Sequence, residues 1–270
     1  MSSMIEDRGQ EDLTKGDPPA PYRRRSKPAR AHKAAMVIAE EIVHKISQNG
    51  YLPGTKLPTE KEMLEEYGVG RGTLRESLRF LEMNGVITMK PGPGGGPITG
   101  QPDARDLAAT LALFLQMHRT PFRAIVEVRM DIEPIIAKLA ATHATPESLR
   151  NIQMYVDMMR SNLDNKTAFL EANDGFHNAV AQASGNQVFA LLIGSLHWIT
   201  DGSPLGVDYP EDRRGAVLDA HEKVYEAIAV GDAPGAESAM ANHIREFDRY
   251  LDRFYSAVYD SELVWGDITT

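Results

Sequence analysis

The segment that most constrains the fold spans residues 56–87, KLPTEKEMLEEYGVGRGTLRESLRFLEMNGVI, and it predicts two short helices joined by a tight turn. Pro58 favours an extended backbone before the first helix, and Thr59 is a good N-cap for it. Apolar residues recur at helical spacing inside that helix, and Gly68 is expected to end it. The second helix is expected to begin at Arg71.

The second helix is expected to have one apolar and one basic side. Its apolar residues are Leu74, Leu78, Phe80 and Leu81. Its other faces carry Arg71, Thr73, Arg75 and Arg79. A helix that shows Arg and Thr in its first turn while its opposite side is buried suits insertion into the major groove of DNA. Residues 86–90 alternate like a strand, residues 91–97 (PGPGGGP) indicate a loop, and Ile98-Thr99 could return as a second strand. Together these elements predict a winged helix-turn-helix.

These ordered motifs resemble the DNA-binding domain of the GntR family of bacterial transcription regulators. The family pattern is L-P-[ST]-E-x-x-[LM], then G-V-x-R-x-[TP]-[LV]-R-E-[AS]-L-x-x-L, then G-[LVI]-[IL], and the resemblance covers about Ala31 to Thr99. It implies a set of DNA-binding positions in this chain: Thr59, Lys61, Arg71, Thr73, Arg75, Lys90 and Gly92. The two arginines are expected to pair with guanine, and the lysines and the glycine-rich wing to approach the backbone or the minor groove.

Charge is unevenly distributed along the 270 residues, whose formal net charge is −9. Residues 20–100 hold 13 Lys and Arg against 8 Asp and Glu, whereas residues 101–270 hold 14 against 25. This asymmetry predicts a basic DNA-facing module joined to an acidic module with another role. The chain has no cysteine, which excludes a disulfide framework and a thiolate zinc site. With no long apolar run and no signal-peptide pattern, we expect a cytoplasmic protein with no membrane partner.

The chain is expected to divide into five parts. These are a disordered tail (1–30), the winged helix-turn-helix domain (31–100), a linker (101–103), a helical effector-binding and dimerisation domain (104–262) and a second tail (263–270). The first tail contains a basic cluster, Arg23 to Lys27, that either reaches the DNA or only aids solubility.

Only helical patterns follow the linker. They are expected at 105–118, 121–143, 146–163, 166–184, 187–200, 210–230 and 234–261, with residues 201–209 as a loop. Short connections predict an antiparallel bundle. The expected fold class is therefore mainly α: an N-terminal winged helix-turn-helix with a small β-hairpin wing, and a C-terminal antiparallel all-α helical bundle.

Three histidines of this bundle are candidates for a metal site. Asn173 and His177 share one face of a helix, and His221 and His243 lie on two other helices, which a bundle core can bring together. Three imidazoles and an oxygen donor suit Zn²⁺, Ni²⁺ or Mn²⁺. Spacing alone equally allows surface or singly hydrogen-bonded histidines.

The same region resembles the effector domain of the FadR subfamily. The matching segments are EVRMDIEPIIAKLAA at 127–141, NDGFHNAVAQASGN at 173–186, HEKVYEAIAVGD at 221–232 and ANHI at 241–244. The resemblance implies that the three histidines are metal ligands beside an effector pocket. The family's Asp is Asn173 here, and a neutral amide is the weaker donor. We therefore expect the ion to bind weakly, together with an anionic effector, or not at all. The neighbouring Asp174 is expected to point away from the His177 face.

Arg129 is the remaining candidate effector-binding residue, in addition to His177, His221 and His243. A guanidinium group can bind a carboxylate through two parallel hydrogen bonds. The alternative is an ion pair with Glu133, one helical turn later, and both can hold if the ligand replaces Glu133.

The sequence thus predicts a homodimeric transcription regulator, most often a repressor, of a metabolic operon. It would bind a palindromic double-stranded DNA operator and answer to a small carboxylate or acyl effector. No catalytic residue is expected. Two alternatives remain: an architectural DNA-binding dimer whose bundle pocket is filled by side chains, and a metal-dependent enzyme using the three histidines. The enzyme alternative lacks a general base beside His177.

Overall fold

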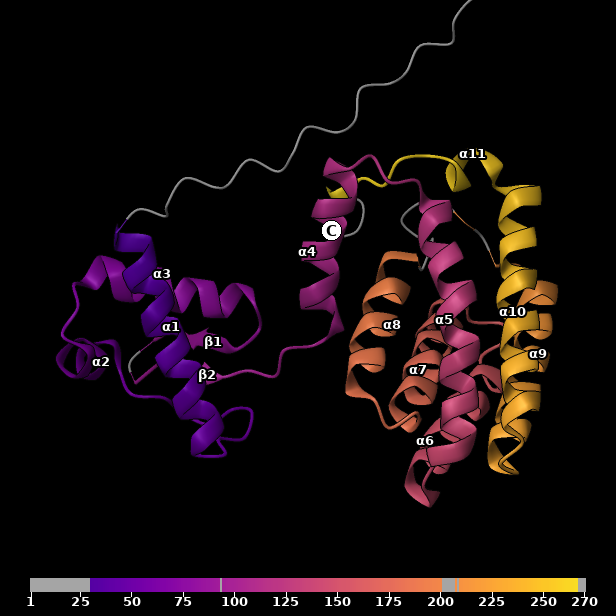
Figure 1. Cartoon of the computed structure of the whole chain (residues 1–270), viewed down its shortest axis with the longest axis horizontal. Helices are drawn as coiled ribbons and strands as arrows, with labels where there is room; N and C mark the ends of the chain where they lie inside the picture. Colours follow the sequence, from indigo (N-terminus) through magenta and orange to yellow (C-terminus); the bar gives the residue numbers. More distant parts are fainter. Residues whose placement is uncertain (1–29, 93, 201–206, 208, 267–270) are drawn as a thin grey trace, which may run out of the picture.

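The computed structural model describes residues 30–92, 94–200, 207 and 209–266. These residues form eleven α-helices and a two-stranded sheet. Figure 1 shows the first three helices and the sheet on one side of the molecule, the larger group of helices on the other, and α4 between them. The expected tail 1–30 and basic cluster Arg23 to Lys27 lie outside the described residues, except for Arg30.

The N-terminal module is a winged helix-turn-helix, as the sequence predicts. Its elements are α1 (Arg30–Gln48), α2 (Glu60–Tyr67), α3 (Arg71–Met83), β1 (Ile87–Lys90) and β2 (Gly96–Thr99). The strands are antiparallel, with Ile87 opposite Thr99 and Lys90 opposite Gly96. The second strand starts two residues earlier than expected, because Gly96 and Pro97 already pair with the first strand.

Local sequence signals explain where α2 begins and ends. Thr59 caps its N-terminus, and Glu62 bonds back to the backbone of Thr59, so both form a capping box. Gly68 ends the helix in the left-handed region at φ 63°, which glycine adopts without steric cost. These two signals fix the short helix that precedes the DNA-facing one.

The buried face of α3 differs from the expected one at two residues. Leu74, Leu78 and Leu81 are buried, but Phe80 is 40% exposed. Ser77 takes the core position instead, and its hydroxyl donates to the backbone oxygen of Ala35 at 2.7 Å. That bond ties α3 to α1 and satisfies the buried hydroxyl.

The C-terminal module is the expected helical bundle. Its helices are α4 (Ala104–Met117), α5 (Phe122–His143), α6 (Pro146–Arg160), α7 (Lys166–Ala183), α8 (Gln187–Thr200), α9 (Glu211–Ala229), α10 (Ala233–Phe254) and α11 (Ser256–Tyr259). The helix bounds agree with the expected helix bounds within a few residues for all but the last helix. That helix ends at Phe254 and is followed by the short α11. One hydrophobic core runs through the bundle, and its largest members include Phe122, Phe169 and Phe176. None of the helices in the described residues has the length and apolarity to cross a lipid bilayer.

Both ends of α4 are held in place. Asp103 caps its N-terminus in a capping box with Asp106. The segment expected as a C-terminal tail, 263–270, is packed as far as it is described, because Leu263 is buried and Trp265 donates its indole N–H to the Ala109 oxygen of α4 at 3.0 Å. The linker therefore leads directly into a helix that is anchored to the bundle.

Candidate effector pocket and DNA-reading surface

The structure brings the three histidines of the bundle together. His177 comes from α7, His221 from α9 and His243 from α10, and all three side chains are buried. Their Nε2 atoms converge, at 3.0 Å for the pair His221–His243, 3.2 Å for His177–His221 and 3.3 Å for His177–His243. The cluster thus joins three helices at one point.

The cluster has the dimensions of a metal site. An ion bound about 2.0 to 2.1 Å from each of three nitrogens, in tetrahedral or octahedral geometry, leaves those nitrogens about 3.0 to 3.4 Å apart. Burial lowers the pKa of His177 to about 4, and burial also holds the pKa values of His221 and His243 well below the ordinary value. Neutral imidazoles have the lone pairs that metal binding requires. These residues therefore fit a divalent ion.

Glu133 on α5 orients the first of these histidines. A carboxylate only accepts, so Nδ1–H of His177 donates to Oε2 of Glu133 at 2.5 Å and leaves the Nε2 lone pair directed at the cluster. The other oxygen, Oε1, accepts from Nε of Arg129 at 2.6 Å. Burial acts to raise the pKa of Glu133, but Arg129 and the nearby histidines hold it well below its ordinary value. The arrangement matches a carboxylate–histidine–metal relay.

The sequence indicates Glu133 only as an ion-pair partner of Arg129, and the expectation that no carboxylate lies beside His177 is wrong. That pair exists, and both side chains are buried. The bond from Glu133 to His177 crosses between helices that are 44 positions apart in sequence, so spacing along one helix gave no signal for it.

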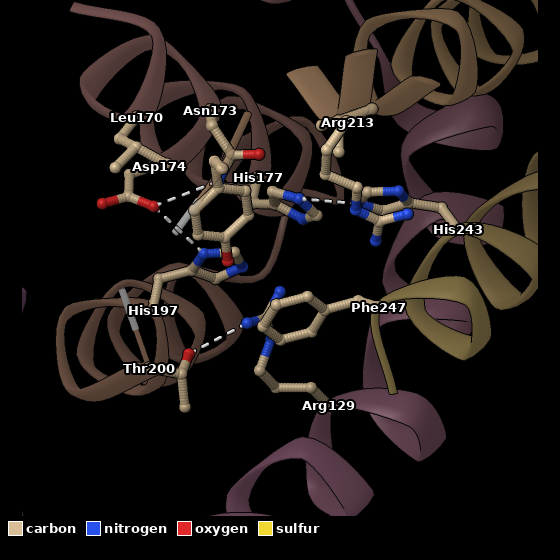
Figure 2. A pocket seen from close by; sticks show the side chains of 12 residues that line it. Arg129, Leu170, Asn173, Asp174, His177, His197, Thr200, Arg213, His243 and Phe247 are labelled. Carbon is tan, nitrogen blue, oxygen red and sulfur yellow. Dashed lines mark hydrogen bonds and ion pairs between the residues drawn. The ribbon is translucent and has the colours of Figure 1, made fainter. Parts of the chain in front are cut away.

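A small cavity of about 20 Å³, enough for about one water molecule, lies beside the cluster and opens to solvent. Figure 2 shows Arg129, Asn173, His177 and His243 around it, each matching an expected site residue. The fourth expected effector ligand, His221, is fully buried and is not among the residues that line the cavity. Arg129 also donates to the hydroxyl of Thr200 at 2.9 Å. The pocket is thus lined by polar groups at the edge of the histidine cluster.

Asn173 and Asp174 both line this cavity. The Asn173 amide nitrogen donates to Oδ1 of Asp174 at 3.3 Å, and Figure 2 shows its oxygen on the side away from Asp174. Within the described residues, Asp174 makes no hydrogen bond or ion pair with the three-histidine cluster, although it does line the pocket. Its carboxylate faces α8, where it lies 3.3 Å from Nδ1 of His197, and α8 forms that wall of the pocket. His197 is itself a buried residue that lines the pocket.

The seven expected DNA-binding residues all belong to the N-terminal module. Arg71, Arg75, Lys61, Lys90 and Gly92 are exposed, and Thr73 is half-buried on α3. The Arg75 guanidinium lies 3.3 Å from Glu60, a pairing that the sequence did not suggest. The Thr59 hydroxyl is already bonded to Glu62. The role of Thr59 within the module is therefore to cap α2.

Comparison with known proteins identifies both modules. Residues 34–95 match the family described as bacterial regulatory proteins, gntR family, and residues 124–246 match the FCD domain. An uncharacterized HTH-type transcriptional regulator of Bacillus subtilis (strain 168), YcbG, is 31% identical over 211 residues, which cover 78% of this chain and 87% of YcbG. The chain belongs to the GntR family. Its combination of domains is the FadR-type architecture of that family.

Further relatives agree with this assignment. The HTH-type transcriptional repressor NanR of Escherichia coli (strain K12) is 26% identical over 229 residues, covering 82% of this chain and 85% of NanR. The solved structure of Streptococcus agalactiae GntR has a TM-score of 0.58 at 25% identity, covering 80% of this chain and 99% of that chain. These relatives are regulators and not enzymes. The protein is accordingly a DNA-binding regulator of transcription, in a family whose FCD domains bind small-molecule effectors and can bind metal.

Proposed function

We infer that this protein is a repressor of a metabolic operon, that it binds a palindromic operator as a homodimer, and that a small carboxylate or acyl effector modulates this binding from the FCD pocket. The observation that carries the proposal is the joint presence of an exposed basic helix, α3, and a buried polar pocket beside a histidine cluster. This role places the protein beside the chromosome, in the cytoplasm.

The DNA-reading roles follow from side-chain chemistry and exposure. Arg71 and Arg75 at the start of α3 are assigned to guanine, which an arginine contacts through N7 and O6. Thr73 serves a phosphate or a thymine methyl group. Lys61 and Lys90 serve phosphates as point charges. Gly92, at φ 95°, lets the wing backbone approach the DNA closely, and Thr59 positions α2 by capping it.

In the FCD pocket, His177, His221 and His243 would hold a divalent ion, Zn²⁺, Ni²⁺ or Mn²⁺, with the amide oxygen of Asn173 as a neutral fourth donor. Such an ion would offer open coordination positions to an effector carboxylate. Glu133 fixes the orientation of His177, and Arg129 lies where its guanidinium can bind an acidic group of the ligand.

The contacts of α8 support control of the DNA module from this pocket. His197 and Thr200 of α8 line the cavity. On the neighbouring turn, the Ser195 hydroxyl donates to the backbone oxygen of Ala104 at 2.9 Å, and the Trp198 ring lies 5.7 Å from the Arg105 guanidinium. Both partners belong to the first turn of α4, next to the linker. A ligand that binds one position of α8 more tightly than another would shift the placement of the DNA modules.

The proposed function is tested by selecting operator DNA from a random duplex pool with the full chain. The enriched sequence should contain an inverted repeat, and sedimentation should give the mass of a dimer. A pool that yields no enriched sequence, or a single half-site bound by a monomer, would count against the proposal. The polar lining of the cavity, which includes Arg129, His177 and His243, favours an effector-binding role over an effector-independent architectural dimer.

A further inference from the structure

Arg213 borders the pocket with a buried nitrogen that has no partner. It lies in the first turn of α9, and Figure 2 shows it on the same side of the cavity as His243. Its Nε atom is buried and makes no hydrogen bond. One terminal nitrogen donates to the backbone oxygen of Glu246 at 3.3 Å, at the long end of hydrogen-bond distances. An unsatisfied buried N–H is costly, so a ligand oxygen at Arg213 would be favourable.

No carboxylate among the described residues is paired with this guanidinium group. The carboxylate of Glu246 binds Arg249 instead. The face of the Arg213 group is stacked on Tyr250, at 4.5 Å from the ring centroid, which holds the guanidinium plane in position. Arg213 is therefore a preorganised cation with no counter-ion in the part of the chain that the structure describes.

Arg129 offers a second guanidinium group to the same cavity. It approaches from the side of Thr200: its Nε donates to Glu133, its Nη1 donates to the Thr200 hydroxyl, and its guanidinium lies 5.4 Å from the centre of the Phe247 ring. Figure 2 shows the two arginines entering the cavity from different helices, α5 and α9. A ligand with two separate acidic groups can contact both.

The charge balance of the pocket points in the same direction. The two positive charges of Arg129 and Arg213 are balanced by the two negative charges of Glu133 and Asp174. The net charge of these four side chains is therefore zero. Asn173 contributes no charge. A divalent ion on the histidine cluster would add two positive charges with no carboxylate at position 173 to reduce them. A dianionic ligand restores neutrality, whereas a monoanion leaves one positive charge in a buried site.

We propose that the effector is a small dicarboxylate, with one carboxylate at Arg129 and Thr200 and the other at Arg213, which distinguishes dicarboxylates from monocarboxylates. This inference rests on the proposed function, because it assigns the effector of the same pocket.

The test is calorimetric titration of the full chain with malonate, succinate and glutarate, each compared with its own monoamide. The monoamide keeps the length and shape of the acid and removes one charge. At least one of the three acids should bind at least about tenfold more tightly than its monoamide, as expected for a charged hydrogen-bonded pair. Inorganic phosphate should bind more weakly than that acid.

The Arg213→Gln variant separates the role of this residue from a general loss of folding. It should lower the affinity for the dicarboxylate, so that the acid and its monoamide bind with nearly equal affinity. Its circular dichroism spectrum should be unchanged. The Arg213→Lys variant should retain part of the preference for the acid over its monoamide. The exposed Arg245→Gln variant on α10 is the matched control and should keep the full ratio of acid affinity to monoamide affinity.

Three results would overturn the proposal: equal binding of acid and monoamide, a ratio that survives in Arg213→Gln, or no binding of any of the six compounds. Specific DNA binding is measured on the same preparation by gel shift. If the DNA is bound and none of the compounds is, the dicarboxylate assignment fails while the DNA-binding function stands.

Discussion

Nδ1 of His177 donates a hydrogen bond of 2.5 Å to Oε2 of Glu133, and both side chains are buried. This bond selects the tautomer in which the His177 Nε2 lone pair faces His221 and His243. Because Glu133 also binds Arg129, one carboxylate connects the histidine cluster to the cationic wall of the pocket. The relationship makes Glu133 a positioning residue for the proposed metal site.

Replacing Glu133 with Gln should therefore weaken metal binding without removing a ligand. We expect a loss of about 10- to 100-fold in affinity, the usual effect of removing such a supporting carboxylate. Competition with a chromophoric chelator measures it for Zn²⁺. Thermal stability should fall as well, because Arg129 loses its buried counter-ion. Asp131→Asn removes an exposed carboxylate from the same helix and should change neither quantity, and an unaltered Zn²⁺ affinity in Glu133→Gln would refute the positioning role.

Replacing Asn173 with Asp should have the opposite effect. The substitution adds a charged oxygen donor beside the cluster and removes one unit of positive charge from the loaded pocket. We expect Zn²⁺ affinity to rise by at least about tenfold, on the scale of one charged ligand contact. Asn178→Asp, on the same helix but bordering a different cavity, is the control. If Asn173→Asp binds Zn²⁺ no better than the native chain, residue 173 is not a ligand position.

Elemental analysis of tag-free protein tests the cluster itself. The native chain should retain a divalent metal, and His221→Ala should lose it, because the remaining two histidines no longer enclose the ion. His221→Ala should also alter the effector response more than the DNA affinity. His118→Ala, at the exposed C-terminal end of α4, should behave like the native chain. Equal metal content in the His221→Ala and native proteins would exclude the cluster as the site.

Substitutions on the DNA module should separate base reading from phosphate binding. Arg71→Ala should cost about 1 to 3 kcal/mol of specific binding and relax the sequence preference while leaving the dimer intact. Lys61→Ala should weaken binding to all sequences alike and reduce the salt dependence by about one unit of slope. Gel-shift titrations at several salt concentrations distinguish the two. Retained preference in Arg71→Ala would remove that residue from the base-reading set.

Local signals in the sequence account for the elements that were predicted well. Thr59 and Gly68 bound α2 through side-chain and backbone preferences that act within a few residues. The error at Phe80 arose from weighting hydrophobicity above periodicity. Leu74, Ser77, Leu78 and Leu81 follow the spacing of one helical face, whereas Phe80 falls off that face even though it is apolar.

The pocket was only partly predictable, because its contacts cross between helices. The resemblance to the FadR subfamily selected His177, His221 and His243, and spacing alone did not. The angle between Asp174 and His177 on one helix does not reveal that the side of α7 facing α8 also borders the cavity. No sequence pattern marks Arg213 as a pocket residue, because its role follows from the position of its unpaired nitrogen at the cavity wall.

The contact between α8 and α4 gives a last prediction about how the pocket reaches the DNA module. Gly194 of α8 packs so closely on α4 that a Cβ atom added there would lie 2.6 Å from Cβ of Ala104, which forces the two helices apart. Gly194→Ala should therefore weaken the effect of the effector on operator binding while leaving effector affinity and effector-free operator binding near native values. Gly215→Ala on α9, whose added Cβ would meet nothing within 4 Å, is the matched control. Anisotropy titrations of operator DNA with and without effector measure the coupling between the two sites. A Gly194→Ala protein with native coupling would show that the signal travels through another contact.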